Sequence, residues 1–253
     1  MIADNIYDRY FTRIRNRMIR QNKNWLCVIC GSPGSGKSYS ALTMAKELCD
    51  RFDENYLVLT PEKFIEKIND RDNLQKGDII IFDEAGVGLS SRNWQSLQNK
   101  LMGLIFQTFR HLNLGVIFTV PNLSFIDVQA RKLFHTYLQT NYIDEKKKLC
   151  YIKTYDIQHN SMLDKTYYKR PTFIVNGKRF KMRLLGVGMP PKSILQPYEK
   201  MKSEFTRKLN EEALQTIMDK TKKKEKAKCP ECNMSHGYWT KNGWKCRNCN
   251  KII

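Results

Sequence analysis

The chain has 253 residues, with 44 Lys or Arg against 25 Asp or Glu and a formal net charge of +19 at pH 7. This length is enough for one α/β domain with a core and a small additional domain. No apolar run is long enough to predict a membrane-spanning helix. The positive charge favours polyanionic partners, nucleic acid first and an anionic membrane surface second, with a generally solvated basic surface as the alternative.

The N-terminal segment is charged and predicts a helix. Residues 1–20 lack the apolar core of a secretory signal peptide, so we expect a cytoplasmic protein, in the host cytoplasm if the chain is viral. Residues 4–20 predict an amphipathic helix with Ile6, Tyr10, Ile14 and Met18 on one face. Its arginines could contact DNA phosphates or a neighbouring subunit, or the helix could pack with its basic side in solvent. We treat residues 1–23 as a basic helical segment ahead of the main domain.

A glycine-rich loop follows the first predicted strand. Residues 25–30 form an apolar run of strand length, and residues 38–51 predict a helix. Between them, residues 31–38 read Gly-Ser-Pro-Gly-Ser-Gly-Lys-Ser and match the phosphate-binding pattern G-x-x-x-x-G-K-[ST] at every fixed position. Strand, loop and helix in this order place backbone N–H groups around a phosphate at the positive end of a helix.

This loop predicts a nucleotide site. Lys37 would reach the β- and γ-phosphates, and the Ser38 hydroxyl would bind Mg²⁺. The predicted nucleotide-binding residues are Gly31, Ser32, Pro33, Gly34, Ser35, Gly36, Lys37, Ser38 and Tyr39. Cys27 and Cys30 have the spacing of a redox motif, but they lie inside the first strand, so we interpret them as core residues.

A second nucleotide motif lies in the third predicted strand. Residues 55–60 predict the second strand, and Pro61 opens a helix that ends at Asn69. Residues 78–84 (Asp-Ile-Ile-Ile-Phe-Asp-Glu) then predict a buried strand that ends in two adjacent carboxylates. Asp83 would hold Mg²⁺ through its water shell, and Glu84 would polarise the attacking water. Together with the loop, this motif favours hydrolysis of ATP over hydrolysis of GTP or an inactive nucleotide site.

Further helices and strands complete the predicted domain. The elements expected after the acidic pair are a loop and helix over 90–111, a fourth strand over 114–120 and a helix over 126–135. A β-extension over about 136–185 follows, with strands at 136–144, 149–158, 172–175 and 178–185 and a turn at Asn176-Gly177. Residues 186–191 break this pattern, and residues 193–220 predict a long charged helix.

The β-extension is basic. Residues 145–185 contain eleven Lys or Arg and three acidic residues. Five aromatic residues lie among them: Tyr151, Tyr155, Tyr167, Tyr168 and Phe173. This pattern predicts either phosphate contacts with base stacking or an extension with ordinary core aromatics and lysine-protected strand edges.

The C-terminal part predicts a metal-bound domain. Residues 220–228 form a basic linker, and the four cysteines after it, spaced C-x2-C, thirteen residues, C-x2-C, are Cys229, Cys232, Cys246 and Cys249. Four thiolates bind Zn²⁺ tetrahedrally and stabilise a segment too short to fold by apolar burial alone. We therefore predict a structural zinc ribbon over 229–253 with a hairpin at Asn242-Gly243. Because four sulfurs complete the site, His236 is interpreted as a bystander and the zinc as non-catalytic.

Several segments resemble the FtsK/HerA superfamily of P-loop ATPases, in particular its viral packaging and zonular occludens toxin-like members. They are the two nucleotide motifs, residues 109–119, residues 126–131 and residues 190–202. The resemblance covers about residues 24–205. With the motifs it implies an α/β P-loop NTPase fold over 24–219 with a mostly parallel, RecA-like sheet, to which the β-extension and the Cys₄ zinc ribbon are added.

The resemblance also implies oligomerisation and further site residues. Members of the superfamily are ring-shaped motors, commonly hexamers, in which a neighbouring subunit supplies an arginine to the transferring phosphate. Arg110 by motif, and Arg92 by position, are the candidates here. The family places a γ-phosphate-sensing Gln after the strand-ending Thr, whereas Val120 follows Thr119 in this chain. Thr119 or Asn122 is therefore the candidate sensor.

The combined expectation is an ATP-hydrolysing homo-oligomeric motor that acts on DNA in packaging, conjugation or a similar transfer and is stimulated by DNA. Its cofactors would be ATP, Mg²⁺ and Zn²⁺. One alternative is a membrane-associated ATPase for virion or filament assembly, which would reach the membrane only through another protein. The other is a nucleotide-switched DNA-binding protein that does not translocate.

Overall fold

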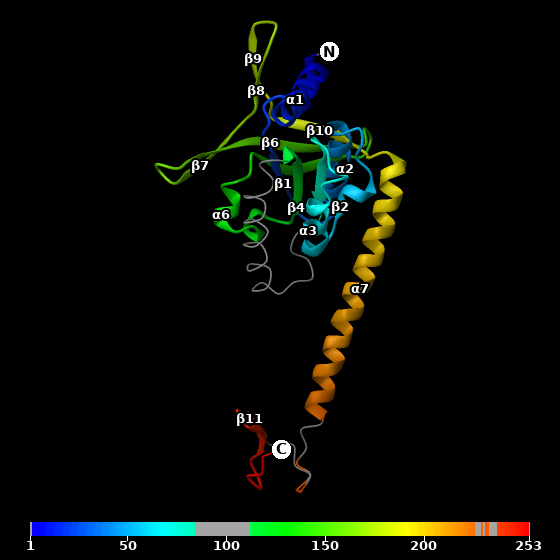
Figure 1. The fold of residues 1–253 in the computed structure, drawn as a ribbon, viewed down its shortest axis with the longest axis vertical. Coiled ribbons are helices and arrows are strands. Elements are labelled where there is room, and N and C mark those ends of the chain that lie inside the picture. Colours follow the sequence, from blue (N-terminus) through cyan, green and yellow to red (C-terminus); the bar gives the residue numbers. More distant parts are fainter. Residues whose placement is uncertain (1, 84–111, 226–228, 230, 233–236, 253) are drawn as a thin grey trace. The chain divides into compact units, whose positions relative to one another are not determined.

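A computed structural model describes residues 2–83, 112–225, 229, 231–232 and 237–252 (Figure 1). It divides into two compact units, Met1–Lys202 and Ser203–Ile253, and each is described by itself. The centre of the first unit is an eight-stranded sheet with the order β10-β6-β5-β1-β4-β3-β2, and β7 pairs with β6. Its strands are β1 (Trp25–Cys30), β2 (Leu57–Val58), β3 (Ile79–Phe82), β4 (Gly115–Val120), β5 (Thr136–Asp144), β6 (Leu149–Asn160), β7 (Lys165–Lys169) and β10 (Leu184–Gly188).

The sheet is parallel on one side and antiparallel on the other. The neighbours β5, β1, β4, β3 and β2 run parallel. Strands β6, β7 and β10 join antiparallel. All residues of β1, β3 and β4 are buried, as expected for parallel strands covered on both faces. The predicted α/β fold with a mostly parallel sheet is therefore confirmed.

Helices accompany this sheet. The described helices are α1 (Ile2–Ile19), α2 (Lys37–Leu48), α3 (Pro61–Asn69), α6 (Val128–Arg131) and α7 (Lys192–Glu225), with short 3-10 helices η1 (Glu54–Tyr56) and η3 (Leu123–Phe125). Helix α3 has the predicted bounds, because the Thr60 side chain accepts the Lys63 N–H and proline occupies the first turn. Among the described helices, none is both long and apolar enough to cross a membrane.

Helix α1 packs against other elements of the first unit, among them α2 and β1. Tyr10, Phe11, Ile14 and Met18 are buried. The Arg13 guanidinium forms an ion pair with Asp156 (N–O distance 2.7 Å) and lies over the Phe173 ring of the neighbouring hairpin. This hairpin, made of β8 (Thr172–Val175) and β9 (Lys178–Lys181), projects beside α1 (Figure 1). Of the three interpretations of the N-terminal helix, these contacts favour packing.

Two predicted elements are shorter than expected. The strand predicted over 55–60 is reduced to β2, because the Asp53 carboxylate accepts the Asn55 N–H and starts η1 in its place. The helix predicted over 126–135 is reduced to α6. Its last predicted residue, His135, instead exchanges hydrogen bonds with the backbone of Leu26 in β1, which continues the chain directly into β5.

The end of the β-extension also differs from the prediction. The single strand predicted over 178–185 is divided into β9 and β10, because the chain leaves the hairpin after Lys181 and returns to the central sheet at Leu184. Residues 186–188, predicted as a break, are the second half of β10 and pair with β6. Helix α7 continues to Glu225, into the segment predicted as a linker.

The second unit contains a hairpin near its C-terminus. Strands β11 (Gly237–Thr240) and β12 (Gly243–Cys246) pair antiparallel, with Thr240 opposite Gly243 across the turn. This agrees with the turn predicted at Asn242-Gly243. The Trp244 side chain is buried beside Cys229 and Cys246. A small core thus forms around the cysteine sulfurs.

A buried carboxylate fixes the start of β3, and we expect it to be important for stability. Asp78 accepts hydrogen bonds from the Gln75 N–H (2.7 Å) and the Tyr56 hydroxyl (3.2 Å), and it pairs with Arg51. Replacing Asp78 with Ala leaves these donors without their acceptor and should lower the free energy of unfolding by about 2–4 kcal/mol in urea denaturation. Asp72→Ala, at an exposed position of the preceding turn, should change it by less than about 0.5 kcal/mol. Equal stabilities of the two variants would contradict this role.

Candidate nucleotide site and cysteine cluster

The glycine-rich loop connects β1 to the N-terminus of α2. Gly36, the residue before the helix, has a φ of 86°, a left-handed conformation that favours glycine. The Lys37 ammonium reaches back over the loop and donates a hydrogen bond to the Ser32 carbonyl oxygen (2.8 Å). Strand, loop and helix therefore follow one another in the predicted order, and the lysine side chain folds back onto the loop.

Strand β5 supports this loop from the side. A Cβ atom at position 31 would lie 1.9 Å from Thr140 Oγ1, so a side chain there would require the neighbouring side chains to move. The Thr140 hydroxyl donates to Ser35 Oγ (2.8 Å). The thiol of Cys150, on the adjacent strand β6, lies 3.5 Å from the Ser35 carbonyl oxygen. The first two strands of the β-extension thus contact the phosphate loop directly.

Asp83 lies at the end of β3, beside the loop. Its side chain has no exposed surface. The Ser38 hydroxyl (2.7 Å) and the Thr119 hydroxyl (2.6 Å) both donate to Oδ1. Because β4 lies between β1 and β3 in the sheet, Thr119 at the end of β4 stands between the loop and the carboxylate. Two predicted Mg²⁺ ligands, Ser38 and Asp83, are therefore in direct contact.

The other carboxylate oxygen is bound by helix α7. Asp83 Oδ2 accepts a hydrogen bond from the Tyr198 hydroxyl (2.8 Å) and lies 3.4 Å from the Lys202 ammonium. Lys202 also donates to the Tyr198 oxygen (2.9 Å). Burial, followed by the negative charge of Asp83, raises the pKa of Tyr198 well above its usual range. The tyrosine is therefore protonated and acts as a donor to the carboxylate.

A second contact joins α7 to the helix that follows the loop. The Tyr39 hydroxyl donates to the Glu199 carboxylate (2.5 Å), and the rings of Tyr39 and Tyr198 meet edge to face at 6.3 Å between centroids. Tyr198, Lys202 and Thr140 were not identified as site residues from the sequence. For Tyr198 and Lys202 the available signal was their spacing of four residues on one helix face, within the segment 190–202 that resembles other superfamily members.

Several predicted residues are placed elsewhere or are not described. Glu84, Arg92 and Arg110 lie outside the described residues. The Asn122 side-chain oxygen accepts the Ser124 N–H (3.0 Å) and caps η3. Val120 is fully buried. Within the part of the chain that the structure describes, Thr119 is the candidate sensor that contacts another predicted site residue, Asp83.

A cavity of about 690 Å³ lies at the start of α2, beyond the loop. Gly36, Tyr39 and Ser40 form one wall. The rest of its lining is largely apolar and includes Ile143, Leu149, Val187, Met189, Pro190 and Leu195. A flat apolar group attached to a phosphate in the loop would fit such a surface.

These residues fit a magnesium–nucleotide complex. A serine hydroxyl and a carboxylate are oxygen ligands of the kind that Mg²⁺ prefers, and they are preassembled at one point. The loop N–H groups at the start of α2 suit a phosphate chain. Ser38 and Asp83 could hold the metal, and residues 31–39 could hold the phosphates.

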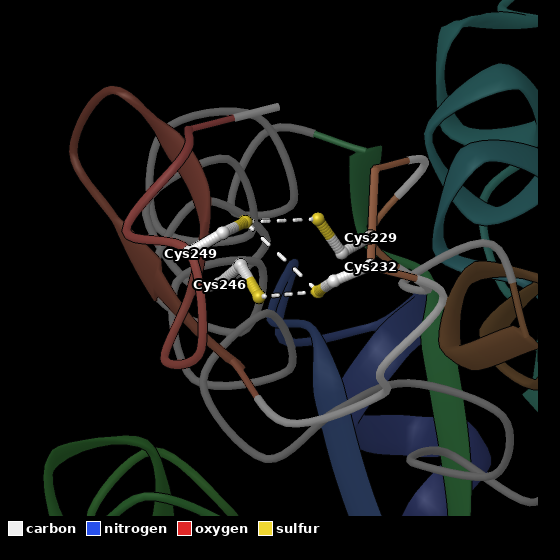
Figure 2. A group of neighbouring side chains, drawn as sticks. All are labelled: Cys229, Cys232, Cys246 and Cys249. Carbon is white, nitrogen blue, oxygen red and sulfur yellow. Dashed lines mark hydrogen bonds between the residues drawn. The ribbon is translucent and has the colours of Figure 1, made fainter.

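The four C-terminal cysteines form a separate cluster. Figure 2 shows their sulfurs pointing toward one another. All four Sγ atoms lie within 4.8 Å of one another. The Cys229–Cys249, Cys232–Cys246 and Cys232–Cys249 sulfur distances are 3.3, 3.5 and 3.9 Å. Zn–S bonds of about 2.3 Å in a tetrahedron place neighbouring sulfurs about 3.8 Å apart, so the cluster has the dimensions of a zinc site.

Backbone N–H groups favour the thiolate form of the first cysteine in each C-x2-C pair. The pKa of the Cys229 thiol is lowered chiefly by the N–H of Cys232, and that of Cys246 chiefly by the N–H of Cys249. In each C-x2-C pair the first sulfur thus accepts from the backbone of the second cysteine. Deprotonated sulfur is the form that binds a metal.

Comparison with known proteins identifies a viral relative. "Uncharacterized protein B-251" of Sulfolobus spindle-shape virus 1 is 28% identical over 148 residues, which cover 47% of this chain and 59% of that protein. The match therefore spans less than two thirds of the viral relative's length.

Three solved structures match part of this chain. The N-terminal domain of zonular occludens toxin from Neisseria meningitidis matches with a TM-score of 0.35 and 15% identity, covering 58% of this chain and 93% of that domain. The cytoplasmic domain of EssC matches with a TM-score of 0.35 and 11% identity, and the match covers 66% of this chain and 38% of that domain. ATPases 2 and 3 of EssC from Geobacillus thermodenitrificans match with a TM-score of 0.34 and 15% identity, and the match covers 76% of this chain and 44% of that structure.

A family model gives the assignment. The model of the zonular occludens toxin (Zot) family matches residues 54–189, which is more than half of the chain and runs from the segment before β2 through β10. The resemblance to the Zot-like members of the FtsK/HerA P-loop ATPases is thereby confirmed, and this chain belongs to the Zot family.

Proposed function

We propose that the chain binds ATP with Mg²⁺ and hydrolyses it. The observation that carries this proposal is the contact between the Ser38 hydroxyl and the buried Asp83 carboxylate at the mouth of the phosphate loop. A hydroxyl and a carboxylate at this position serve one purpose in P-loop proteins, to hold the metal of a nucleotide. Membership of the Zot family supports the same activity.

In the proposed reaction, water attacks the γ-phosphorus, the bond from that phosphorus to the β–γ bridging oxygen breaks, and ADP and inorganic phosphate leave. Lys37 supplies positive charge to the β- and γ-phosphates, and Ser38 and Asp83 hold Mg²⁺, which neutralises the phosphate oxygens when bound. Glu84, the next residue after Asp83, orients the water and takes its proton. An arginine of a neighbouring subunit, Arg110 or Arg92, completes the charge stabilisation.

The cavity beside Tyr39 supports a nucleoside triphosphate rather than a simple polyphosphate. It begins at Gly36, where the loop ends, and its lining is largely apolar. A base and ribose extending from the α-phosphate would cover this surface. We therefore assign the nucleoside to the wall formed by residues 187–195 and the turn between β5 and β6.

We propose DNA as the substrate of the resulting motor, with a homo-oligomeric ring as the working form. Six Lys and Arg side chains on β7, on the β8–β9 hairpin and just after it are exposed: Lys165, Lys169, Lys178, Arg179, Lys181 and Arg183. Tyr167 and Tyr168 are exposed among them, whereas Phe173 is buried and Tyr155 packs against Tyr137. The exposed charges suit phosphate contacts, and the two exposed rings suit base stacking.

The second candidate function is a membrane-associated assembly ATPase, which the Zot family match favours. In that case the basic hairpins would contact a protein partner or anionic lipid, and the membrane would be reached through another protein. A nucleotide-switched DNA-binding protein would share the DNA contacts but not the movement. DNA binding separates the assembly ATPase from the other two functions, and ATP-driven displacement of a triplex strand separates the motor from the switch.

We also propose that the cysteine cluster binds zinc and that residues 229–253 form a zinc ribbon. Its support is the sulfur geometry and the backbone N–H groups on Cys229 and Cys246. In this organisation residues 24–219 are the ATPase domain and residues 220–228 connect it to the ribbon.

The nucleotide proposal predicts the behaviour of two variants. Lys37→Ala and Glu84→Gln should each lower kcat for ATP hydrolysis at least about 100-fold, because the first removes phosphate charge stabilisation and the second removes the base. Glu84→Gln should still bind ATP in a calorimetric titration. Lys63→Ala, an exposed lysine of α3, is the control and should hydrolyse ATP normally. Retained hydrolysis in both site variants would exclude the assignment.

The DNA proposal predicts a change in salt dependence. A Lys178→Ala and Arg179→Ala double variant should bind duplex DNA more weakly, and the slope of log K against log salt should fall in magnitude by about two. The matched double variant Lys63→Ala and Arg71→Ala removes two exposed charges outside the hairpin and should keep the wild-type slope. Equal slopes for wild type and both double variants would show that this hairpin does not contact DNA.

The zinc proposal predicts metal content. Purified protein should contain about one zinc per chain by elemental analysis, and Cys246→Ser should lose it, because three sulfurs hold zinc less tightly than four. Cys49→Ser, a buried cysteine of the first unit, should keep the wild-type zinc content. Zinc-free wild-type protein after expression in zinc-supplemented medium would contradict the proposal.

A further inference from the structure

Helix α7 reaches the metal side of the candidate nucleotide site. The two partners of Asp83 Oδ2 among the described residues, the Tyr198 hydroxyl and the Lys202 ammonium, come from one face of this helix. A third residue of the same two turns, Glu199, accepts the Tyr39 hydroxyl. The start of α7 is therefore bonded both to the metal-binding carboxylate and to the helix that follows the phosphate loop.

Lys202 and Asp83 form an ion pair inside a largely buried site. Asp83 has no exposed surface, and the Lys202 side chain is 29% exposed. The other described donors to this carboxylate, Ser38, Thr119 and Tyr198, are neutral hydroxyls. A buried carboxylate is stable in its charged form only with such donors and a nearby cation. Lys202 supplies positive charge to it.

A metal at the same carboxylate would compete with this lysine. A divalent cation held by Ser38 and Asp83 places a second positive centre on a group that Lys202 already neutralises. The Lys202 ammonium and the divalent cation repel each other, and the metal neutralises Asp83 in place of the lysine. The lysine and the metal are thus alternative partners of one carboxylate.

We propose that Lys202 is the counter-ion of Asp83 in the nucleotide-free protein and that it gives way when a magnesium–nucleotide complex binds. The first turns of α7 then respond to the occupancy of the site. This inference rests on the proposed nucleotide function and adds a positioning residue that acts through Asp83. The strand position after Thr119 holds the apolar Val120, which cannot respond to a phosphate. Under this proposal Lys202 on α7 is instead a side chain that responds to the nucleotide.

Thermodynamic linkage predicts the direction in which Mg²⁺ affinity changes when Lys202 is replaced. If Lys202 stabilises only the nucleotide-free state, its removal must favour the metal-bound state, because the coupling between two ligands of one site is reciprocal. A merely structural lysine would stabilise both states equally, and its removal would leave metal binding unchanged. A lysine that binds the nucleotide itself would give the opposite sign.

The test is a Mg²⁺ titration of the 253-residue chain with a fluorescent ADP analogue, read by fluorescence anisotropy. In Lys202→Met the half-saturating Mg²⁺ concentration should fall about 5-fold or more relative to wild type. The thermal midpoint of the nucleotide-free variant should also fall, since Asp83 loses its counter-ion, while Mg–ADP should raise that midpoint by more than it does in wild type. Lys200→Met, at an exposed position of the same helix, should behave as wild type in both measurements.

Two further variants keep the outcome decisive. Lys202→Arg retains the charge and should restore the wild-type Mg²⁺ dependence. If Lys202→Met does not fold, Lys202→Gln removes the charge but keeps a hydrogen-bond donor, and it should show the same fall. An unchanged or increased half-saturating Mg²⁺ concentration in the folded neutral variant overturns this inference alone. Absence of any Mg²⁺-dependent nucleotide binding in wild type overturns the proposed function and this inference with it.

Discussion

The structure depends on the hydrogen bonds and the ion pair made by one buried carboxylate, that of Asp83. Asp83 has no exposed surface, yet both of its oxygens accept hydrogen bonds, from Ser38 and Thr119 on one side and from Tyr198 and Lys202 on the other. An unpaired charge in this position would cost several kcal/mol, so these donors stabilise the folded domain. Because the donors come from α2, β4 and α7, this one group ties the phosphate loop, the sheet and the C-terminal helix together.

The order of the strands makes this arrangement possible. Across the sheet the strand order is β1-β4-β3. The phosphate loop follows β1, Asp83 follows β3, and Thr119 is the next-to-last residue of β4 between them. All three strands run parallel, so their carboxyl ends lie at the same edge. Sites in open α/β sheets lie outside these ends. Helix α7 then returns to this edge and covers the metal side.

Local sequence pattern was sufficient for part of this site and insufficient for the rest. The phosphate loop and the strand before Asp83 are contiguous motifs, and the start of α3 could be predicted from Pro61, because the preference of proline for the first helical turn is local. Residues 186–188 were predicted as a break because glycines weaken a strand, but pairing with β6 overrides that preference. The Tyr198–Asp83 bond joins residues 115 positions apart, so no local pattern contains it.

The contact between Gly31 and Thr140 has a consequence for how this chain can vary. The first residue of the phosphate loop and a residue of β5 occupy adjoining space, with no room for a Cβ atom at position 31. Thr140 also donates to Ser35, so shortening it would make space at the cost of a hydrogen bond to the loop. The two positions are therefore epistatic: which residue is tolerated at one is set by the size of the other. Sequence change in the β-extension is thus constrained by the nucleotide loop, although the two segments are more than a hundred residues apart.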